Sequence, residues 1–347
     1  MKTQEQDSDQ FKLGDLLEIW IPTYNRAEKL RNILSDLADS IVADCRITVS
    51  DNASDDDTKA VCKSIAGRLP NLVYRRQIYN IGANANILEG LKYVSHPYFW
   101  IVCDDDRLCF KAFEKQFFDF TKKKVDVMLL ASAHSTINPS NKLMELYGGE
   151  VVSIRQIMNA CEDLVSIMSF LPSVIYRKAI LDSSVIYSGY GNCAFMYPHM
   201  PLIAKVVNQN MQAGVFLEAV VRRGIDVPPF STKKRFWLAW CHSCRFLDNE
   251  HYRNISKWSV LGGYSFRSWA SIVRNLLILD LICPEESMQT YAPLSSFPRV
   301  IFFAYLLGSI ILAPIRLIPK GIVFRVLKIF FPGKKLLSTD RIKEFAS

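Results

Sequence analysis

The run that most constrains the fold is Tyr98-Phe-Trp-Ile-Val-Cys-Asp-Asp-Asp106, in which an apolar segment ends abruptly in three consecutive carboxylates. The apolar part predicts a strand covered on both faces, because β-branched and aromatic residues suit a buried parallel sheet. Burying adjacent unpaired aspartates is costly, so the acids should lie where the strand leaves the core. In open α/β sheets, ligands bind at this edge. Clustered carboxylates there favour Mg²⁺ or Mn²⁺. The alternative interpretation is an acidic turn that caps the next helix.

The segments before this run alternate between strand and helix. Apolar residues at strand spacing predict strands at 17–22, 45–50 and 72–76. Helical spacing fills the intervening segments, which end near Ala38, Gly67 and Val94. This alternation predicts an α/β fold, in which helices flank both faces of a mostly parallel sheet. The polar loops that follow the strands would then gather at one edge of the sheet.

Composition and missing motifs narrow the class of protein. Lys and Arg (42) exceed Asp and Glu (34) by eight, and the C-terminal region is both basic and apolar. This favours an anionic membrane surface as a partner and argues against nucleic acid. The nine cysteines are an odd number scattered through apolar segments, which is typical of reduced thiols in the cytosol. We expect no cleaved secretion signal at the start of the chain. The absence of a G-x-G-x-x-G or Walker A motif disfavours dinucleotide-binding and P-loop proteins.

Four segments, in this order, resemble the successive signatures of family 2 glycosyltransferases with the GT-A fold. They are Leu17-Glu-Ile-Trp-Ile-Pro-Thr-Tyr-Asn-Arg26, Val49-Ser-Asp-Asn-Ala-Ser-Asp-Asp-Asp-Thr58, Asn80-Ile-Gly-Ala-Asn-Ala-Asn86 and Cys103-Asp-Asp-Asp106. The resemblance is strong over the N-terminal third and holds in outline beyond it. It implies an inverting transfer of a sugar from a nucleoside-diphosphate donor.

The resemblance also implies roles for individual residues. The segment from Pro22 would line the nucleoside, Asp51 would accept a hydrogen bond from the base, and the turn from Gly82 would let the backbone approach the donor. The implied donor-binding set is Pro22, Thr23, Tyr24, Asn25, Asp51, Asn52, Gly82, Asn84, Asn86 and Asp104. Asp106 and Asp104 would hold Mn²⁺ or Mg²⁺, which stabilises charge on the leaving diphosphate and makes Asp106 catalytic. Asp105 would be the variable middle position of Asp-x-Asp.

The general base of the family, an acidic residue, is missing from its expected setting. The matching region, 188–202, is a Gly-rich loop that runs into a helix, and His199 lies nearest to the expected acid. Histidine has a suitable pKa for a base, but a histidine that caps or packs at the helix start is the alternative. Glu162 and Asp163 are more typical of a solvated face within a helix predicted over 148–168. The Tyr197-Pro-His199 pattern resembles O-antigen transferases of the abequosyltransferase type.

The C-terminal region differs in character from the rest. Residues 300–315 are apolar throughout but shorter than the about 20 residues that span a bilayer. Residues 321–331 follow a basic amphipathic pattern. Together they predict a monotopic or re-entrant hairpin in the cytoplasmic leaflet, with a buried core helix as the alternative. The predicted organisation is a disordered tail (1–16), a nucleotide-sugar-binding half (17–128), an acceptor-binding half (129–235), a helical extension (236–296) and membrane-anchoring helices (297–347).

These observations predict a metal-dependent glycosyltransferase, peripheral or monotopic at the cytoplasmic face of the inner membrane. It would add a sugar to a lipid-linked oligosaccharide on polyprenyl diphosphate during O-antigen synthesis, with an abequosyltransferase-like deoxysugar transfer as the narrower expectation. One alternative is transfer directly to polyprenyl phosphate, an acceptor that is already anionic and needs no base. Another is a non-catalytic GT-A-like scaffold, which the complete Asp-x-Asp motif disfavours.

Overall fold

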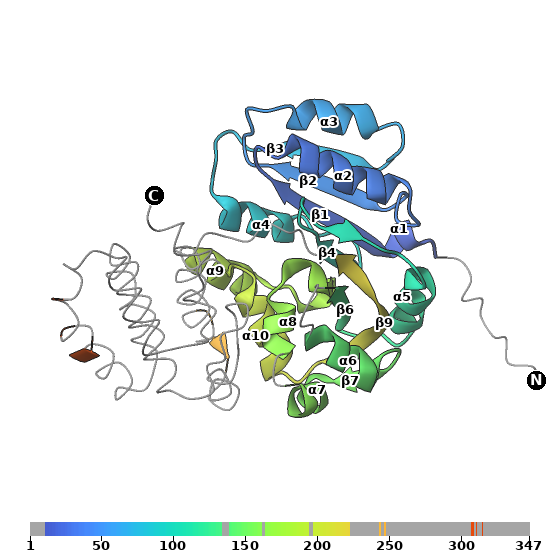
Figure 1. Ribbon diagram of the computed structural model, residues 1–347, viewed down its shortest axis with the longest axis vertical. Coiled ribbons are helices and arrows are strands. Elements are labelled where there is room, and N and C mark those ends of the chain that lie inside the picture. The colour runs from blue at the N-terminus through green and yellow to red at the C-terminus, as the bar shows by residue number, and fades with distance from the viewer. Residues whose placement is uncertain are drawn as a thin grey trace, which may run out of the picture. The chain divides into compact units, whose positions relative to one another are not determined.

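A computed structural model describes residues 11–133, 139–161, 164–193 and 197–222, together with the single positions 243, 246, 247, 307, 308, 310 and 314. The chain divides into two compact units, Met1–Cys193 with Pro198–Ile225, and Ala194–Tyr197 with Asp226–Ser347. The helices and strands labelled in Figure 1 belong to the first unit. The predicted boundary between the two halves, at 128/129, falls inside one strand of this unit.

Nine strands form one sheet in the described part of the chain, in the order β3-β2-β1-β4-β8-β6-β9-β5, and β7 also pairs with β9. Strands β1 to β4, β6 and β9 run parallel to one another, whereas β5, β7 and β8 run antiparallel to their neighbours. This confirms the mostly parallel α/β sheet. The strand bounds are β1 (Leu17–Thr23), β2 (Arg46–Asp51), β3 (Leu72–Arg76), β4 (Tyr98–Ile101), β5 (Arg107–Leu108), β6 (Val127–Ala133), β7 (Val151–Ser153), β8 (Val174–Arg177) and β9 (Gln212–Arg222).

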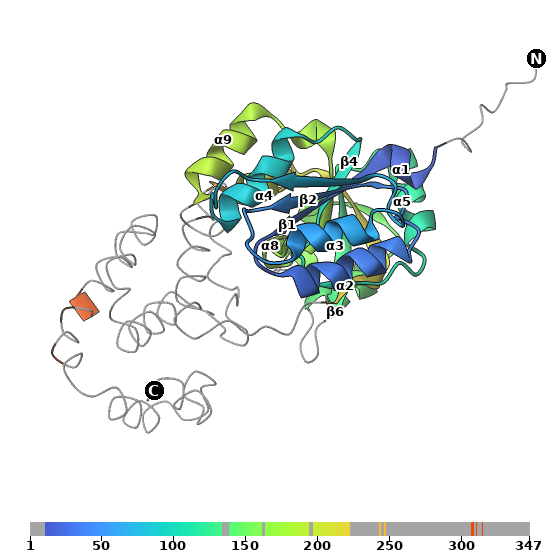
Figure 2. The same ribbon diagram turned by 90° about the horizontal axis from the view of Figure 1, so that it is seen from above.

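Helices cover both faces of the sheet, and Figure 2 shows α2 and α3 on one face with α4 on the other. The α-helices are α1 (Leu13–Leu16), α2 (Ala27–Ala38), α3 (Thr58–Ile65), α4 (Ala83–Lys92), α5 (Phe113–Lys122), α6 (Pro139–Tyr147), α7 (Ile154–Ala160), α8 (Leu164–Met168), α9 (Ser183–Gly191) and α10 (Met200–Asn208). Two 3₁₀ helices flank β8 at Leu171–Ser173 and Lys178–Ile180. The alternation predicted from residue 17 to residue 94 is confirmed, with ends that differ by a few residues.

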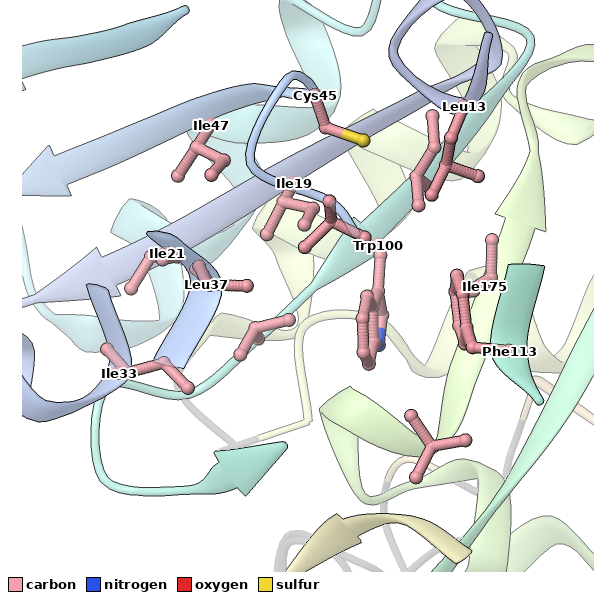
Figure 3. Packing of buried hydrophobic residues seen from close by; sticks show 14 of the residues in the cluster. Leu13, Ile19, Ile21, Ile33, Leu37, Cys45, Ile47, Trp100, Phe113 and Ile175 are labelled. Carbon is pink, nitrogen blue, oxygen red and sulfur yellow. The ribbon is translucent and has the colours of Figure 1, made fainter. Parts of the chain in front are cut away.

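The core forms because successive side chains of a strand point to opposite faces. In β1, Ile19 and Ile21 join a buried cluster that also contains residues of α3. Figure 3 shows them beside Ile33 and Leu37 of α2. Trp20 points the other way, toward α4, where a Cβ added to Gly90 would lie 2.4 Å from the indole ring. Only glycine allows α4 to approach β1 this closely. The central strand β4 is buried along its whole length, as predicted from its sequence.

Trp100 connects this strand to the second half of the sheet. Its indole stacks on Phe113 with ring centroids 5.9 Å apart, and its Nε1 donates to the backbone oxygen of Pro172 at 2.9 Å. The aromatic contact from β4 to α5 is visible in Figure 3. The hydrogen bond leads to the 3₁₀ helix before β8, so one buried side chain ties β4 both to α5 and to the segment that precedes β8.

Two predictions about secondary structure are wrong. The predicted disordered tail ends too late, because Leu13 is buried in the core and residues 13–16 form α1. The helix predicted over 148–168 begins as strand β7, because Val152 pairs with Ala213 of β9. The helical part, α7, starts only after Ser153, whose hydroxyl accepts from the backbone N–H of Gln156. Strand pairing across about 60 residues therefore overrides the local helical spacing.

Several predictions fall on residues outside the described ranges. They are the extension 236–296 and the membrane-anchoring helices 297–347, apart from single positions, and the acidic pair at 162 and 163. The predicted Gly-rich loop is partly described, and its first residues, Ser188 to Gly191, lie within α9. Within the described residues, no helix combines the length and the apolar character needed to cross a membrane.

Candidate active site

The loops after β1 and β4 meet at Asp104. Thr23 Oγ1 donates to Asp104 Oδ2 at 2.7 Å, and Arg26 Nη1 donates to Asp104 Oδ1 at 3.0 Å. The Asp104 residue is only 4% exposed. Burial raises the pKa of its carboxyl, while the Thr23 hydroxyl and the Arg26 guanidinium act in the opposite direction. Both oxygens of Asp104, a predicted ribose and metal contact, therefore have partners within the protein.

The loops after β1 and β2 are tied together by reciprocal contacts. Asn25 adopts a left-handed backbone conformation, with φ of 50°. Its backbone N–H donates to Ser54 Oγ at 2.9 Å, and its Oδ1 accepts from the N–H of Asp55 at 2.8 Å. Asp56 Oδ2 then accepts from the N–H of Ala27, in the first turn of α2. The predicted donor residue Asn25 thus has a defined structural role at the rim of the site.

Asp51 is the buried anchor of the loop after β2. Its Oδ1 accepts from the backbone N–H of Ser54 at 2.8 Å, and its Oδ2 accepts from the Tyr74 hydroxyl. Arg76 Nε lies 3.5 Å from the same Oδ2. Burial and the hydrogen bond to Asp51 raise the pKa of Tyr74. A carboxylate can accept about four hydrogen bonds, so these contacts leave its predicted role toward a nucleotide base open.

The turn before α4 joins the same edge through Asn52. Asn52 Nδ2 donates to Asn80 Oδ1 at 2.8 Å, and its Oδ1 accepts from the N–H of Ile81 at 2.9 Å. Gly82 follows with φ of 86°, a conformation that favours glycine. A Cβ built at Gly82 meets no atom within 4 Å, so the space beside this backbone is open. This fits the prediction that a ligand approaches the main chain here.

Asn86 and Asn84 hold the turn in place. Asn86 is 1% exposed, its Nδ2 donates to the Ser50 carbonyl at 2.8 Å, and its Oδ1 accepts from Ser50 Oγ at 2.6 Å. Asn84 Nδ2 donates to the carbonyl of Cys193. Both residues are predicted to bind the donor, and in this structure the side chains of both form hydrogen bonds within the protein. Pro22 is half-buried in β1, whereas Tyr24 is 42% exposed.

The second and third aspartates face a cysteine. Ligand atoms of Cys103, Asp105 and Asp106 all lie within 4.8 Å of one another, and this is the group in the described residues that could hold a metal ion. Asp106 is 3% exposed. Burial, the three neighbouring carboxylates and a hydrogen bond with Asp106 raise the pKa of the Cys103 thiol. Two carboxylates suit Mg²⁺ or Mn²⁺, so the donor set fits such an ion.

Three residues of this site, Arg26, Cys103 and Asp105, have no role that was predicted from the sequence. Arg26, half-exposed, contacts Asp104 and, at 3.2 Å, Asp105 Oδ2. Asp105 belongs to the ligand cluster in place of the predicted Asp104, and Cys103 completes it. Arg26 is a cation in the loop that follows the first strand, and this position was the feature of the sequence that could have indicated a role at the site. The turn that places Asp105 and Asp106, and not Asp104, beside Cys103 has no signal in the sequence.

The chain after the aspartates is fixed to α2. Arg107 Nε lies 2.7 Å from Asp36 Oδ2, and Arg107 Nη2 lies 2.8 Å from Asp36 Oδ1. Such bidentate pairs constrain geometry as well as adding energy. The acidic turn is therefore held at one end by strand β4 and at the other by an ion pair to a helix.

His199 lies at the start of α10, where it was expected. It is 4% exposed, and its Nε2 donates to the carbonyl oxygen of Ser169 at 2.9 Å. The proton of the neutral ring is therefore on Nε2. Burial lowers the pKa of His199 to about 4, and the hydrogen bond to Ser169 acts in the opposite direction. The neutral ring can accept a proton, but its packing also fits the structural alternative, so the role of general base stays a prediction.

Comparison with known proteins agrees with this arrangement. Residues 18–181 match the family model described as Glycosyl transferase family 2. Abequosyltransferase RfbV of Salmonella typhimurium is 27% identical over 207 residues, which cover 56% of this chain and 61% of that protein. The GalNAc(5)-diNAcBac-PP-undecaprenol beta-1,3-glucosyltransferase of Campylobacter jejuni is 32% identical over 93 residues, or 26% of this chain and 30% of that protein. The matches span less than two thirds of either relative.

Solved structures share the fold. S. aureus TarS 1-349 superposes with a TM-score of 0.55 at 16% identity, covering 85% of this chain and 90% of that one. The same S. aureus fragment in complex with UDP-GlcNAc gives a TM-score of 0.53 at 16% identity, covering 85% of this chain and 88% of that one. At this identity the likeness shows the fold alone, which is the GT-A-like α/β arrangement that the sequence predicts.

Proposed function

We propose that this protein transfers a sugar from a nucleoside-diphosphate donor to a saccharide on polyprenyl diphosphate, with inversion at the transferred sugar. The match of residues 18–181 to the Glycosyl transferase family 2 model supports this reaction class. The observation that carries the proposal is the convergence of four strand-end loops at one edge. Hydrogen bonds join Thr23 to Asp104, Asn25 to Ser54 and Asn52 to Asn80. Ligands of open α/β sheets bind at this edge.

The donor would lie along these loops. The exposed ring of Tyr24 offers a stacking surface for a base. The open space beside Gly82 accommodates a ligand close to the main chain. The complex of the S. aureus neighbour with UDP-GlcNAc supports a nucleotide sugar as the ligand class. The buried residues Asp51, Asn52, Asn86 and Asp104 orient the loops that carry these contacts.

Asp105 and Asp106 would hold the divalent ion, Mn²⁺ or Mg²⁺, with Cys103 beside them. Such an ion, when bound, stabilises the negative charge that grows on the leaving diphosphate. Asp104 positions the site, since it fixes Thr23 and Arg26. The half-exposed Arg26 guanidinium is then a second cation near the diphosphate.

On the acceptor side, we propose His199 as the general base, which would take the proton of the acceptor hydroxyl. Its lowered pKa keeps the ring neutral at neutral pH, which is the form a base needs, at the cost of basicity. No Asp or Glu occurs from Ser183 to Asn208. The lack of a carboxylate base in this segment favours a second candidate function, transfer to polyprenyl phosphate. The phosphate oxygen of that acceptor is already anionic and needs no base.

The relatives suggest the narrower substrate classes. The name of the Salmonella relative points to a deoxysugar such as abequose, and that of the Campylobacter relative to an undecaprenol-diphosphate acceptor. We therefore propose a step in the synthesis of an O-antigen-like surface polysaccharide. The basic, apolar C-terminal sequence supports a peripheral or monotopic position at the cytoplasmic membrane surface.

A transfer assay tests this function. The full chain would be incubated with Mn²⁺, a panel of nucleoside-diphosphate sugars and two acceptors, a short saccharide on polyprenyl diphosphate and bare polyprenyl phosphate. We expect one donor to extend the saccharide only. A product on polyprenyl phosphate alone would establish the second candidate. The absence of any product, together with the absence of donor binding, would leave the scaffold alternative.

A further inference from the structure

We propose that Cys103 is a third ligand of the cation site and makes this site selective for thiophilic ions. The inference rests on the proposed function, in which Asp105 and Asp106 hold a divalent ion. It concerns the choice of ion: carboxylates alone would favour Mg²⁺ or Mn²⁺, whereas a sulfur ligand shifts the preference toward Zn²⁺ and Co²⁺.

The distances support a shared ion. A divalent ion lies about 2.0–2.6 Å from its oxygen, nitrogen or sulfur ligands, so two ligands of one ion are at most about 5 Å apart. The Cys103 sulfur and the oxygens of Asp105 and Asp106 all lie within 4.8 Å of one another. These three atoms therefore already have the mutual spacing that one ion requires, before any side chain moves.

The neighbouring residues explain why the sulfur is the third member. Asp104, the carboxylate closest in sequence, accepts from Thr23 and Arg26 with both of its oxygens. Asp104 is not a member of the group whose ligand atoms lie within 4.8 Å of one another, whereas Asp105 belongs to that group although one of its oxygens also lies 3.2 Å from Arg26 Nη1. Cys103 is intermediate in exposure, and its sulfur lies within 4.8 Å of a carboxylate oxygen of Asp105 and of Asp106. The turn is anchored beyond Asp106 by the bidentate pair of Arg107 with Asp36, which limits how far the ligands can separate.

The chemical consequence is a change of selectivity. For most nitrogen, oxygen and sulfur sites the affinity rises from Mn²⁺ through Co²⁺, and soft thiolates further favour Zn²⁺. A purely carboxylate site weakens this preference because oxygen ligands also suit hard ions. A site with one sulfur and two carboxylates would bind Zn²⁺ and Co²⁺ through all three residues, and Mn²⁺ mainly through Asp105 and Asp106.

Metal titrations of the full chain test the proposal. The variants are Cys103→Ser and Cys103→Ala, with Cys109→Ser as the matched control, because Cys109 is an exposed cysteine of the same segment. Calorimetry would measure Mn²⁺ and Zn²⁺ affinity. Absorption spectroscopy of the Co²⁺ adduct would detect the near-ultraviolet charge-transfer band of a thiolate–cobalt bond. Circular dichroism would confirm that each variant is folded.

We expect both Cys103 variants to lose about tenfold or more in Zn²⁺ affinity, since even outer-shell changes at metal sites act on that scale. Their Mn²⁺ affinity should change by less than about threefold. The Co²⁺ band should appear in the wild type and in Cys109→Ser and disappear in the Cys103 variants. An unchanged Zn²⁺ affinity in folded Cys103 variants, or a wild-type Co²⁺ adduct without the band, would overturn the proposal.

The outcomes also separate this inference from the proposed function. If Mn²⁺ binds and supports transfer while Zn²⁺ affinity is indifferent to Cys103, the inference fails and the glycosyltransferase proposal stands. If transfer proceeds but no divalent ion binds the wild type, the metal site itself is wrong, and the inference fails with it. If Zn²⁺ binds through Cys103 but no donor is used, the ligand assignment stands without the function.

Discussion

The two sides of the sheet edge are built differently. On the side that we propose binds the donor, called the donor side below, β1 to β4 and the segments that follow them are joined by hydrogen bonds between buried polar side chains, such as Asn86 with Ser50 and Thr23 with Asp104. On the side that we propose binds the acceptor, called the acceptor side below, β6 to β9 come together by strand pairing, and His199 donates to a backbone carbonyl. The donor side is thus preorganised by residues of its own motifs, whereas the acceptor side depends on contacts between distant segments.

The largest expected effect concerns the metal-facing aspartate. Asp106→Asn should lower kcat/KM by about 10²–10³-fold, the scale on which lost electrostatic stabilisation of a transition state acts. The fold should be retained, because asparagine has nearly the same shape. The transfer assay and a melting curve would measure the two effects. Asp55→Asn, an exposed carboxyl at the same edge, is the control. A fully active Asp106→Asn variant would contradict the assignment of Asp106 as a ligand of a catalytic metal ion.

The next largest effects are expected at His199, on kcat and on the free energy of unfolding. As a base it should contribute about 10²-fold to kcat, which His199→Gln would remove while keeping an N–H donor for Ser169. Its pKa is about 4 in the folded chain, below the value of an unfolded histidine. The unfolded state therefore takes up the proton first, so this contribution to stability is full above about pH 6.5 and falls as the pH approaches 4.

Urea unfolding would measure that dependence. Between about pH 7.5 and about pH 5, the wild type should lose about 2 kcal/mol of unfolding free energy from this group, and His199→Gln should not. A variant with full activity but without this pH dependence would show that His199 only packs, and the acceptor side would then have no known catalytic residue. A variant with the wild-type pH dependence would contradict the lowered pKa.

The smallest expected effect tests the polar preorganisation of the donor side. Asn86→Ala should lower the free energy of unfolding by about 2 kcal/mol, because it leaves buried groups of Ser50 without partners. Asn84→Ala, in the same helix, removes one partly buried contact to Cys193 and should cost about 1 kcal/mol or less. Denaturant unfolding would measure both. Equal losses of unfolding free energy in the two variants would contradict the idea that the buried Asn86 stabilises the donor side more than the partly buried Asn84 does.

The donor side could be predicted from the sequence because its signals are local. A strand of apolar residues followed closely by polar ones predicts both the element and the edge at which its last residues lie. β1 follows this rule, and in β4 two residues separate the end of the strand from the acids. The acceptor side could not be predicted in the same way. Val151–Ser153 become a strand only because β9 lies beside them, and the pairing of residue 152 with residue 213 leaves no trace in local spacing.

The same distinction between local signals and distant contacts holds within the site. The position of the three aspartates could be predicted from the sequence, but the partners of each aspartate could not. Asp104 is buried because Thr23 and Arg26, about 80 positions earlier, satisfy its oxygens. The pairing of Asp105 and Asp106 with Cys103 follows from the turn that begins after Ile101. The direction of each side chain in such a turn is set by tertiary contacts, which residue spacing does not encode.

The most direct test of the central claim is a thermal-shift panel of nucleoside-diphosphate sugars, each with and without Mn²⁺. A ligand that binds only the folded state raises the melting temperature. We predict that one donor stabilises the protein, that Mn²⁺ increases this shift, and that Asp106→Asn abolishes the increase. A panel in which no donor shifts the melting temperature, with or without the ion, would contradict a nucleotide-sugar site at this edge of the sheet.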